Sequence, residues 1–449
     1  MTHVINIAPL TRIEGHASIA IHLDDAGDVQ YSKVHILSLR GFEKFVEGKP
    51  AEELPRIVNR ICGICPWHHH LASNKAVDRC FGVTPPPAGH KLRELMHTIA
   101  HAEDKLLHFF FLAAADFVLG PDTDYQARNV IGVAKANPEL ARKVVRMRSK
   151  AKMILERFAG KAIHPIAGVT GGFSKPLLEE DRRGMIQDVQ ELLDFALFTM
   201  DFAKQTVFPP YLETIASLGV IRTGFLGTVA EDGAMSLYDG KLRLMRPDGS
   251  SIDFSPADYA EFLGEHVESY SYAKMPYAKV WDEGFSMDLD QPRGMYRSNC
   301  LARMNVVESI PTPRANEELQ EFRERFGRPA QATLLYHWAR LIEEVHVCEH
   351  ALELLKDPEI TDPNVRAEAE PKAGRGVGCV EAPRGTLIHD YSTDDQGLIT
   401  RANMIVGTTH NIGPINMSVN QAARSLIREG QVDETILNKI EMAVRAYDP

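Results

Sequence analysis

The stretch from Arg60 to His70 constrains this chain more than any other. It reads Arg-Ile-Cys-Gly-Ile-Cys-Pro-Trp-His-His-His, which gathers two cysteines, an arginine and three histidines in one short segment. Two thiols at C-x-x-C spacing are typical of a metal centre or of a redox-active disulfide. The sequence contains no second C-x-x-C, so a metal held here needs further ligands of another kind or from another source.

Two simple interpretations of this stretch can be weighed from the residues alone. A zinc site would use Cys62 and Cys65 together with His68, His69 or His70, since structural zinc takes four cysteine or histidine ligands. A thioredoxin-like redox motif would follow a strand in a βαβ unit. The flanking residues here have helical spacing, which disfavours the redox interpretation.

The composition excludes several classes of protein. The chain has 449 residues, of which 44% are hydrophobic and 25% charged, as in a soluble globular protein. A net charge of −11 argues against a nucleic-acid-binding protein. No run of about eighteen apolar residues predicts a membrane-spanning helix, and Met1 to Arg12 lacks the pattern of a signal peptide. We therefore expect a cytoplasmic protein without a membrane span.

The other four cysteines are far apart in the sequence. A chain of this length with such spacing has no disulfide framework. We expect these residues to be small, buried hydrophobic side chains: Cys80, Cys300, Cys348 and Cys379.

Hydrophobic periodicity predicts an α+β fold with a mostly α-helical bundle core, an N-terminal β-hairpin region and a β-rich insertion. We expect one domain over 1–449, with a β-rich N-terminus (1–50), a helical core (51–217), a β-rich insertion (218–300) and a last part of helices and loops (301–449). Strand patterns occupy 16–39, 242–246, 251–254, 380–388 and 398–406. Helical patterns occupy 52–61, 69–81, 89–119, 139–159, 179–217 (broken at Pro209-Pro210), 317–355, 416–428 and 432–447.

Motifs far from the cysteines complete a recognisable set. They are Arg12-Ile13-Glu14-Gly15-His16, Leu39-Arg40-Gly41-Phe42-Glu43, Glu381-Ala382-Pro383-Arg384-Gly385 and Thr408-Thr409-His410-Asn411. Together with R-x-C-G-x-C-x-x-x-H, and in this order from residue 8 onward, they resemble the large, catalytic subunit of nickel–iron hydrogenases. The 66–70 and 408–411 segments are most similar to the cytoplasmic, viologen-reducing branch associated with heterodisulfide reductase.

The resemblance implies a role for each matching residue. Cys62 would be a terminal nickel ligand, and Cys65 would bridge nickel and iron. His69 would lie beside the bridging sulfur and donate a hydrogen bond to it. We expect His68 and His70, which have no counterpart in the family, to be solvated or packed.

Other implied roles fall on residues outside the cysteine stretch. Glu14 would carry protons away from the nickel-bound sulfur, and Glu43 would bind magnesium through its carboxylate. Arg384, which follows Pro383, would sit over the metals and hold a cyanide ligand with Thr408. Asp116 also fits the family pattern, although it could equally be a buried, hydrogen-bonded acid with a purely structural role.

The implied reaction is the heterolytic cleavage of H2 at a nickel–iron centre whose iron carries CN and CO ligands, with a proton leaving through Glu14. The chain has no cysteine cluster for an iron–sulfur centre, which normally takes four thiolates. The electrons would therefore pass to an iron–sulfur small subunit. Beyond it they would reach heterodisulfide reductase through a further electron-transfer subunit.

The chain departs from the family at its end. The family continues D-P-C-x-x-C-x-x-H, whereas the sequence ends at Asp448-Pro449, so half of the nickel ligands and a magnesium ligand are missing. A selenocysteine codon read as a stop, a separate short subunit, or a metal-free relative would each explain this. The remaining alternatives are a simple zinc-binding protein and a metal-free structural or electron-transfer subunit.

Overall fold

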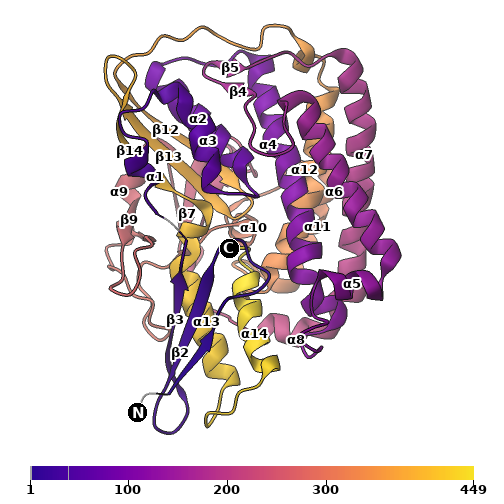
Figure 1. The fold of residues 1–449 in the computed structure, drawn as a ribbon, viewed down its shortest axis with the longest axis vertical. Helices are drawn as coiled ribbons and strands as arrows, with labels where there is room; N and C mark the ends of the chain where they lie inside the picture. Colours follow the sequence, from indigo (N-terminus) through magenta and orange to yellow (C-terminus); the bar gives the residue numbers. More distant parts are fainter. Residues whose placement is uncertain (1–2, 39) are drawn as a thin grey trace.

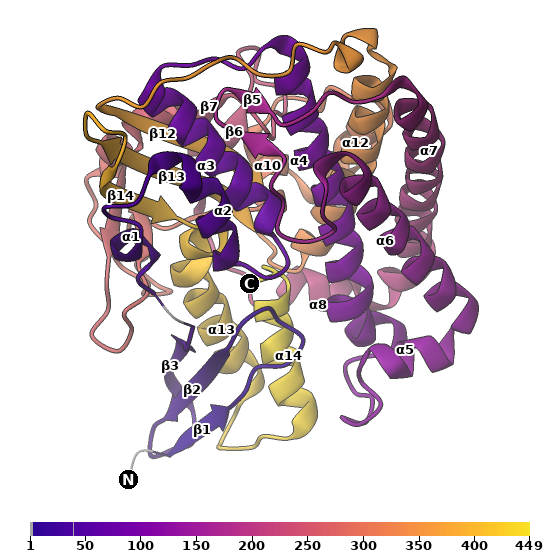
Figure 2. The ribbon, with the colours of Figure 1, turned by 45° about the horizontal axis from the view of Figure 1, so that its top comes forward.

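The computed structural model describes residues 3–38 and 40–449, so Leu39 of the motif quoted above lies outside the described residues. The expected α+β class is confirmed. Figure 1 shows a bundle of long helices on one side, a sheet on the other and a second sheet near the N-terminus. Each of these two sheets has three strands. The C-terminus lies in the middle of the molecule, where these three parts meet (Figures 1 and 2).

Helix α12 is the centre of the bundle. It packs against α4, α7 and α11, and nearly all of its side chains are buried. Such a helix is covered on all sides rather than along one apolar stripe. After α4 the chain continues through two π-helical segments, His108–Ala113 and Ala115–Leu119. The bundle consists of α4 (Pro87–Leu107), α6 (Pro138–Ala159), α7 (Glu179–Phe202), α11 (Pro313–Phe326) and α12 (Leu335–Lys356).

Helix α3 (Pro66–Phe81) lies directly on the antiparallel sheet of β12 (Gly374–Ala382), β13 (Gly385–Thr393) and β14 (Ile399–Ile405). Three alternate glycines of β12 make this possible. A Cβ at Gly374, Gly376 or Gly378 would lie 1.9 to 2.3 Å from a backbone carbonyl oxygen of α3. Those carbonyls belong to every fourth residue of the helix, so they are spaced about 6 Å apart along its axis. The glycines are every second residue of the strand and are spaced about 6.7 Å apart, so the two spacings nearly match. The glycines therefore fix where the N-terminus of α3 lies.

The N-terminal sheet confirms the expected hairpin. Strands β2 (Ala17–Leu23) and β3 (Val29–Ile36) are antiparallel, and β1 (Val4–Ile7), which was not expected, adds to the outer edge of β2. Helix α13 (Ile412–Leu426) packs on β3, and α14 (Glu434–Arg445) packs on α13. The last helix therefore delivers the C-terminal residues to the middle of the molecule (Figure 2).

Strands also occupy the stretch expected to be rich in them. The order β11-β6-β7-β8 forms one sheet, and β9 pairs with β10 in another. The strands predicted over 242–246 and 251–254 are confirmed as β7 and β8, which pair as a hairpin. The strands are β6 (Gly224–Val229), β7 (Lys241–Met245), β8 (Ser251–Phe254), β9 (Leu263–His266), β10 (Met275–Ala278) and β11 (Tyr296–Arg297).

Two predicted elements were wrong. The single helix over 317–355 is two helices, because Gly327 takes a positive φ of 78° and Pro329 cannot continue a helix. The single strand over 380–388 is the end of β12 and the start of β13, with Pro383 and Arg384 as the turn between them.

The remaining elements are short. The 52–61 stretch contains only a five-residue α-helix flanked by 3-10 turns, and the glycine-rich 168–174 loop contains a two-residue strand pair. Among the residues that the structure describes, no helix combines the length and apolar character needed to cross a membrane. These elements are α1 (Phe42–Phe45), α2 (Leu54–Val58), α5 (Val130–Ala136), α8 (Leu212–Ser217), α9 (Tyr259–Phe262), α10 (Cys300–Val306), β4 (Gly168–Val169) and β5 (Gly172–Phe173).

Candidate active site

A cavity of about 270 Å³ lies where four segments meet. They are the segment between β1 and β2 (residues 8–16, here called the N-terminal arm), the loop before α3, the β12–β13 turn and the loop after β14. Six of the nine residues singled out in the sequence line it, although they come from four separate segments. The last residue of the chain, Pro449, lines it as well. The six are Glu14, Cys62, Cys65, His69, Arg384 and Thr408.

The two cysteines stand at the start of α3. Cys65 is the N-cap residue of this helix, and its backbone N–H donates to Cys62 Sγ at 3.0 Å. The two residues are joined as a disulfide, with Cα atoms 5.5 Å apart. A helix N-terminus favours negative charge, so in the reduced form this position stabilises thiolates. The other four cysteines are free and buried, as expected.

Arg384 is held by two carboxylates. It lies in the two-residue turn between β12 and β13, directly after the buried Pro383. Its Nη1 lies 2.9 Å from Asp104 Oδ2, and its Nη2 lies 3.1 Å from Asp448 Oδ1. Burial disfavours the charge, but Asp104 and Asp448 outweigh this and raise the pKa of Arg384. The group is therefore a fixed cation in the cavity wall.

Two glycines bring Arg384 and Thr408 together. Gly385 has a φ of 142°, and a Cβ on it would lie 2.7 Å from the carbonyl oxygen of Gly407. No other residue fits this close approach of two backbones. Arg384 precedes Gly385 and Thr408 follows Gly407, so both residues line the same cavity.

Glu14 reaches the cavity from the N-terminal arm. Its backbone N–H donates to the carbonyl oxygen of Pro449 at 3.2 Å. Its side chain extends toward the loop between the cysteines, since a Cβ on Gly63 would lie 3.6 Å from Glu14 Oε1. A carboxylate beside two cysteines is well placed to exchange protons with them.

Asp116 lies outside the lining of this cavity. It is buried between Arg12 Nη2, at 2.6 Å, and Arg445 Nε, at 3.1 Å, and so ties the N-terminal arm to α14. Neither Asp448 nor Asp104, the two acids that contact Arg384, was among the predicted site residues. Asp104 lies in α4. A charged side chain on the buried face of a long helix was the available signal for it.

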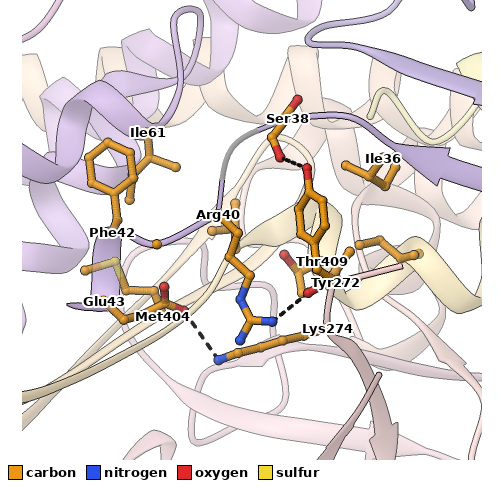
Figure 3. Close-up of a pocket in the computed structure, with 14 residues that line it drawn as sticks. Ile36, Ser38, Arg40, Phe42, Glu43, Ile61, Tyr272, Lys274, Met404 and Thr409 are labelled. Carbon is orange, nitrogen blue, oxygen red and sulfur yellow. Dashed lines mark hydrogen bonds and ion pairs between the residues drawn. The ribbon is translucent and has the colours of Figure 1, made fainter. Parts of the chain in front are cut away.

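Glu43 lines a second, neighbouring cavity of about 160 Å³. Figure 3 shows its carboxylate facing Lys274, with Oε1 3.4 Å from Nζ. The same ammonium lies 2.9 Å from Glu265 and 2.5 Å from Asn403 Oδ1. Three acceptor oxygens, from Glu43, Glu265 and Asn403, thus converge on an ammonium group of the chain itself. In this arrangement they do not fit a magnesium ion, which would need oxygens where the ammonium lies.

The three consecutive histidines have different environments. His69 lines the cavity, and burial lowers its pKa to about 3. His70 is packed away from it, because its Nδ1 lies 2.9 Å from the carbonyl oxygen of Pro55 and its Nε2 accepts from Gly168 N–H at 3.0 Å. A zinc site made of both cysteines and two of these histidines is therefore disfavoured.

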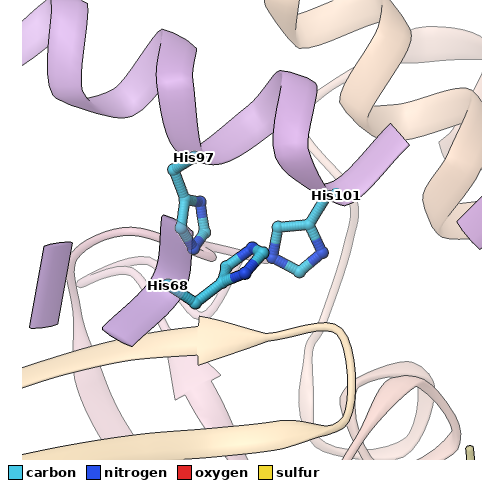
Figure 4. A group of neighbouring side chains, drawn as sticks. All are labelled: His68, His97 and His101. Carbon is cyan, nitrogen blue, oxygen red and sulfur yellow. The ribbon is translucent and has the colours of Figure 1, made fainter. Parts of the chain in front are cut away.

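His68 belongs to a buried group with His97 and His101, drawn from α3 and α4 (Figure 4). The ring centroids lie 4.6 to 5.0 Å apart. The Nε2 atoms of His97 and His101 both lie 2.8 Å from the carbonyl oxygen of Glu381, and the Lys105 ammonium lies 2.8 Å from His101 Nδ1. Since a carbonyl only accepts and an ammonium only donates, His101 keeps a proton on Nε2. His97 and His101 thus use their Nε2 atoms in hydrogen bonds to the chain itself, whereas neither ring nitrogen of the buried His68 has a hydrogen-bond partner among the described residues.

The donor set of the main cavity fits a nickel–iron centre. Thiolates suit such soft or borderline metals. The buried Nε of Arg384 has no hydrogen-bond partner among the described residues, which leaves it available to an anionic ligand of the metal. Cys62 and Cys65 would be the ligands that this chain contributes.

Comparison with known proteins agrees with this geometry. The family model for nickel-dependent hydrogenase matches residues 40–153 and 293–449, and a HoxL-like model matches 4–39. A vhu subunit of the F420-non-reducing hydrogenase from Methanococcus voltae is 50% identical over 426 residues, which cover 95% of this chain and 99% of the relative. The NAD-reducing hydrogenase HoxS subunit beta of Cupriavidus necator is 36% identical over 472 residues, which cover 100% of this chain and 94% of that relative.

A solved structure extends the likeness to the fold. A crystal structure of an NAD+-reducing NiFe hydrogenase in the H2-reduced state superposes with a TM-score of 0.93 at 40% identity, covering 100% of this chain and 98% of that one. Family, fold and cavity lead to one conclusion: the chain belongs to the nickel-dependent hydrogenase family, as a large subunit.

Proposed function

We propose that this protein activates H2 in the cavity around Cys62 and Cys65. A nickel–iron centre bound there would supply the heterolytic cleavage of H2. The observation that carries the proposal is the convergence of two cysteines, a carboxylate and a fixed guanidinium, from distant parts of the chain, on one cavity.

The proposed roles follow from position and charge. Glu14 takes the proton from a cysteine sulfur and passes it outward, because its carboxylate reaches the loop between the cysteines. We propose that the iron of a bound centre carries CN and CO, and that Arg384 and Thr408 would hold the cyanide by donating hydrogen bonds to it. Pro383 fixes the turn that presents Arg384. Asp116 supports the arm of Glu14 through Arg12, with which it forms an ion pair.

We propose that further metal ligands enter the cavity beside Pro449, whose carbonyl oxygen is held by Glu14 N–H. A selenocysteine-containing tail and a separate short subunit would each supply them. The nucleotide sequence after the codon for Pro449 distinguishes the two: an in-frame UGA followed by codons for C-x-x-H supports the tail. Glu43 remains our proposed magnesium ligand, on condition that the Lys274 ammonium moves away from it.

Relatives named F420-non-reducing hydrogenases favour an electron acceptor other than F420. We propose that the direct partner is an iron–sulfur small subunit. Beyond it we propose heterodisulfide reductase in the cytoplasm, reached through a further electron-transfer subunit. Co-purification from native cells tests these partners, and cell fractionation tests the location.

The function is tested by isolating the native complex without oxygen and measuring H2-dependent reduction of a viologen dye. We expect stoichiometric nickel and the infrared bands of CN and CO. Cys62→Ser and Cys65→Ser should each abolish the nickel content, the infrared bands and the dye reduction. A complex with one zinc bound to this chain, no nickel and no infrared bands of CN or CO would instead support the zinc-binding alternative. A complex that contains no metal in this chain would support the structural one.

A further inference from the structure

The last residue of α14 and the four residues after it, here called the 445–449 segment, are held by a hydrogen bond at every position. Each residue accepts from a donor outside the segment, and the five donors lie in five different parts of the chain. Residues 445–448 are at most 1% exposed. The bonds join Arg445 O to His108 Nε2 (2.8 Å), Ala446 O to Arg340 Nη2 (3.1 Å), Tyr447 O to Asn299 Nδ2 (2.7 Å), Asp448 Oδ1 to Arg384 Nη2 (3.1 Å) and Pro449 O to Glu14 N (3.2 Å).

The three bonds to the carbonyl oxygens of residues 445–447 have fixed directions. A carbonyl oxygen only accepts, so His108 carries its proton on Nε2 and donates it. The guanidinium of Arg340 can only donate. The amide of Asn299 cannot be turned around, because its Oδ1 accepts from the backbone N–H of Cys300 at 2.5 Å. Its Nδ2 is therefore the atom that donates to Tyr447.

The three donors take the place of water at the end of α14. The last carbonyls of an α-helix have no partner within the helix, and a cationic side chain such as Arg340 also suits the negative end of the helix dipole. Asn299 is held in an unusual conformation, since its φ of 85° is strained for a residue other than glycine. Such strain persists only where the surroundings fix the residue, and the bonds on both sides of its amide do so.

The three donors also define one register for the segment. A shift by one residue would break all three bonds and move Pro449 by up to about 3.5 Å. It would leave three buried donors without their partners, which costs more than the loss of bonds exposed to water. The observed register is therefore strongly favoured over its neighbours.

We propose that the three donors, His108, Arg340 and Asn299, are positioning residues for the metal site. They hold the 445–449 segment in one register and so place Pro449 in the wall of the active-site cavity. None of the three is among the described residues that line the cavity, so they act through the segment. The consequence rests on the proposed function: where further metal ligands enter beside Pro449, these donors set the point at which the ligands reach the cavity.

Hydrogen exchange of the full chain measures how firmly the segment is held. The reporter amides are those of Tyr447 and Asp448, which donate to the carbonyl oxygens of Val444 and Arg445. Asn299→Asp keeps the size of the side chain and the acceptor for Cys300, but the carboxylate cannot donate to Tyr447. We expect the reporter amides to exchange about tenfold faster or more.

Arg340→Met is the second variant, and it separates a local effect from a general loss of stability. Methionine has a similar length but no donor for the carbonyl oxygen of Ala446. The substitution also removes a buried charge, which is costly to keep, so the chain as a whole need not lose stability. The reporter amides should again exchange about tenfold faster.

Asn305→Asp is the matched control, because Asn305 is a buried asparagine of α10. Its Nδ2 donates to the carbonyl oxygens of Leu301 and Ala330 at 2.9 and 3.1 Å, and its Oδ1 accepts from Ala330 N–H at 2.7 Å. None of these partners belongs to the 445–449 segment. The exchange of the reporter amides should not change. The proposal is overturned if they exchange as fast in this control as in Asn299→Asp, or if they are unchanged in both Asn299→Asp and Arg340→Met.

The same variants test the consequence for the metal site in the native complex. Asn299→Asp and Arg340→Met should lower H2-dependent dye reduction about tenfold or more, as is typical of groups that orient metal-site residues, and should shift the infrared bands of CN and CO. Asn305→Asp should change neither. Unchanged activity and bands in the two variants would overturn the role at the metal site. A complex inactive even without substitutions would contradict the proposed function, while hydrogen exchange would still decide whether the three donors hold the segment.

Discussion

Arg384 Nη2 lies 3.1 Å from Asp448 Oδ1, although 64 residues separate them in the sequence. The contact joins the β12–β13 turn to the end of the chain. On its other side the same guanidinium holds Asp104, so one side chain connects the sheet, the helical bundle and the C-terminal residues. The wall of the active-site cavity thus depends on a single buried cation.

Replacing Arg384 tests whether the site depends on one side chain that contacts Asp104 and Asp448 at the same time. Arg384→Lys keeps the charge, but one ammonium cannot serve both carboxylates as the planar guanidinium does. We expect the free energy of unfolding to fall by about 1 to 3 kcal/mol and H2-dependent dye reduction to fall at least about tenfold. Urea unfolding and the dye assay measure these effects.

The matched control is Arg246→Lys. Arg246 also contacts a carboxylate, Glu283 at 2.6 Å, but both side chains are over one-third exposed. Such surface pairs contribute less than about 1 kcal/mol, and the dye assay should not change. An equal loss in both variants would show that the arginine-to-lysine change itself, rather than the buried geometry, is responsible.

Glu14→Gln tests the proton path. The amide has the size of the carboxylate but cannot take up a proton from a cysteine sulfur. We expect the H2-dependent turnover of the native complex to fall about 100-fold, the range of general acid–base catalysis. Nickel and iron content should not change, because Glu14 is not a proposed ligand. Glu14→Asp should recover part of the activity, and equal turnover in both variants would contradict the role.

The sequence predicted elements whose hydrophobic pattern is uninterrupted. Strand β2 alternates with period two, and α6 has a clear helical period, so both were found within a few residues. The β12–β13 turn was missed because Pro383 and Arg384 are only two residues within a long run of buried positions. Periodicity alone could not show that the chain reverses there.

The site was predictable only where a motif carries it. Glu14, Cys62, Cys65, Arg384 and Thr408 lie in recognisable motifs, and they share one cavity. Asp104 lies in no such motif, and its partner Arg384 is 280 residues away. A contact over that distance depends on the complete fold and leaves no local pattern. The same holds for the hydrogen bond between His69 and His389.

Gly378→Ala tests the packing of α3 on β12. The added Cβ would lie 1.9 Å from the Ala72 carbonyl oxygen, so the helix must move. We expect a loss of about 3 kcal/mol or more, in the range of overpacked or strained core positions, measured by urea unfolding. In the native complex, nickel content should fall as well, because α3 carries Cys65 at its N-terminus.

Gly249→Ala is the control for this substitution. Gly249 has a positive φ of 92° in the β7–β8 turn, and a Cβ there would meet no atom within 4 Å. Its cost is backbone strain alone, about 1 to 2 kcal/mol, with unchanged nickel content. If Gly378→Ala were no more destabilising than this, the close approach of α3 to β12 would be contradicted.

His350 predicts a dependence of stability on pH. Burial lowers its pKa, but hydrogen bonds with Glu353 and Glu94 outweigh this and raise the pKa to about 9. A histidine whose folded-state pKa is raised contributes stability that is fully present below about pH 6.5, its unfolded value, and is lost as the pH rises through about 9. Because the side chain is 27% exposed, solvent screening limits the contribution to about 1 to 2 kcal/mol.

Thermal unfolding of the chain at pH 6 and pH 9.5 should therefore show a decrease in stability that is smaller by this amount in His350→Gln. Replacing both partners in Glu94→Gln/Glu353→Gln should flatten the profile equally, since the proton is held by these two carboxylates; a profile that keeps its slope in the double variant would assign the decrease to other groups.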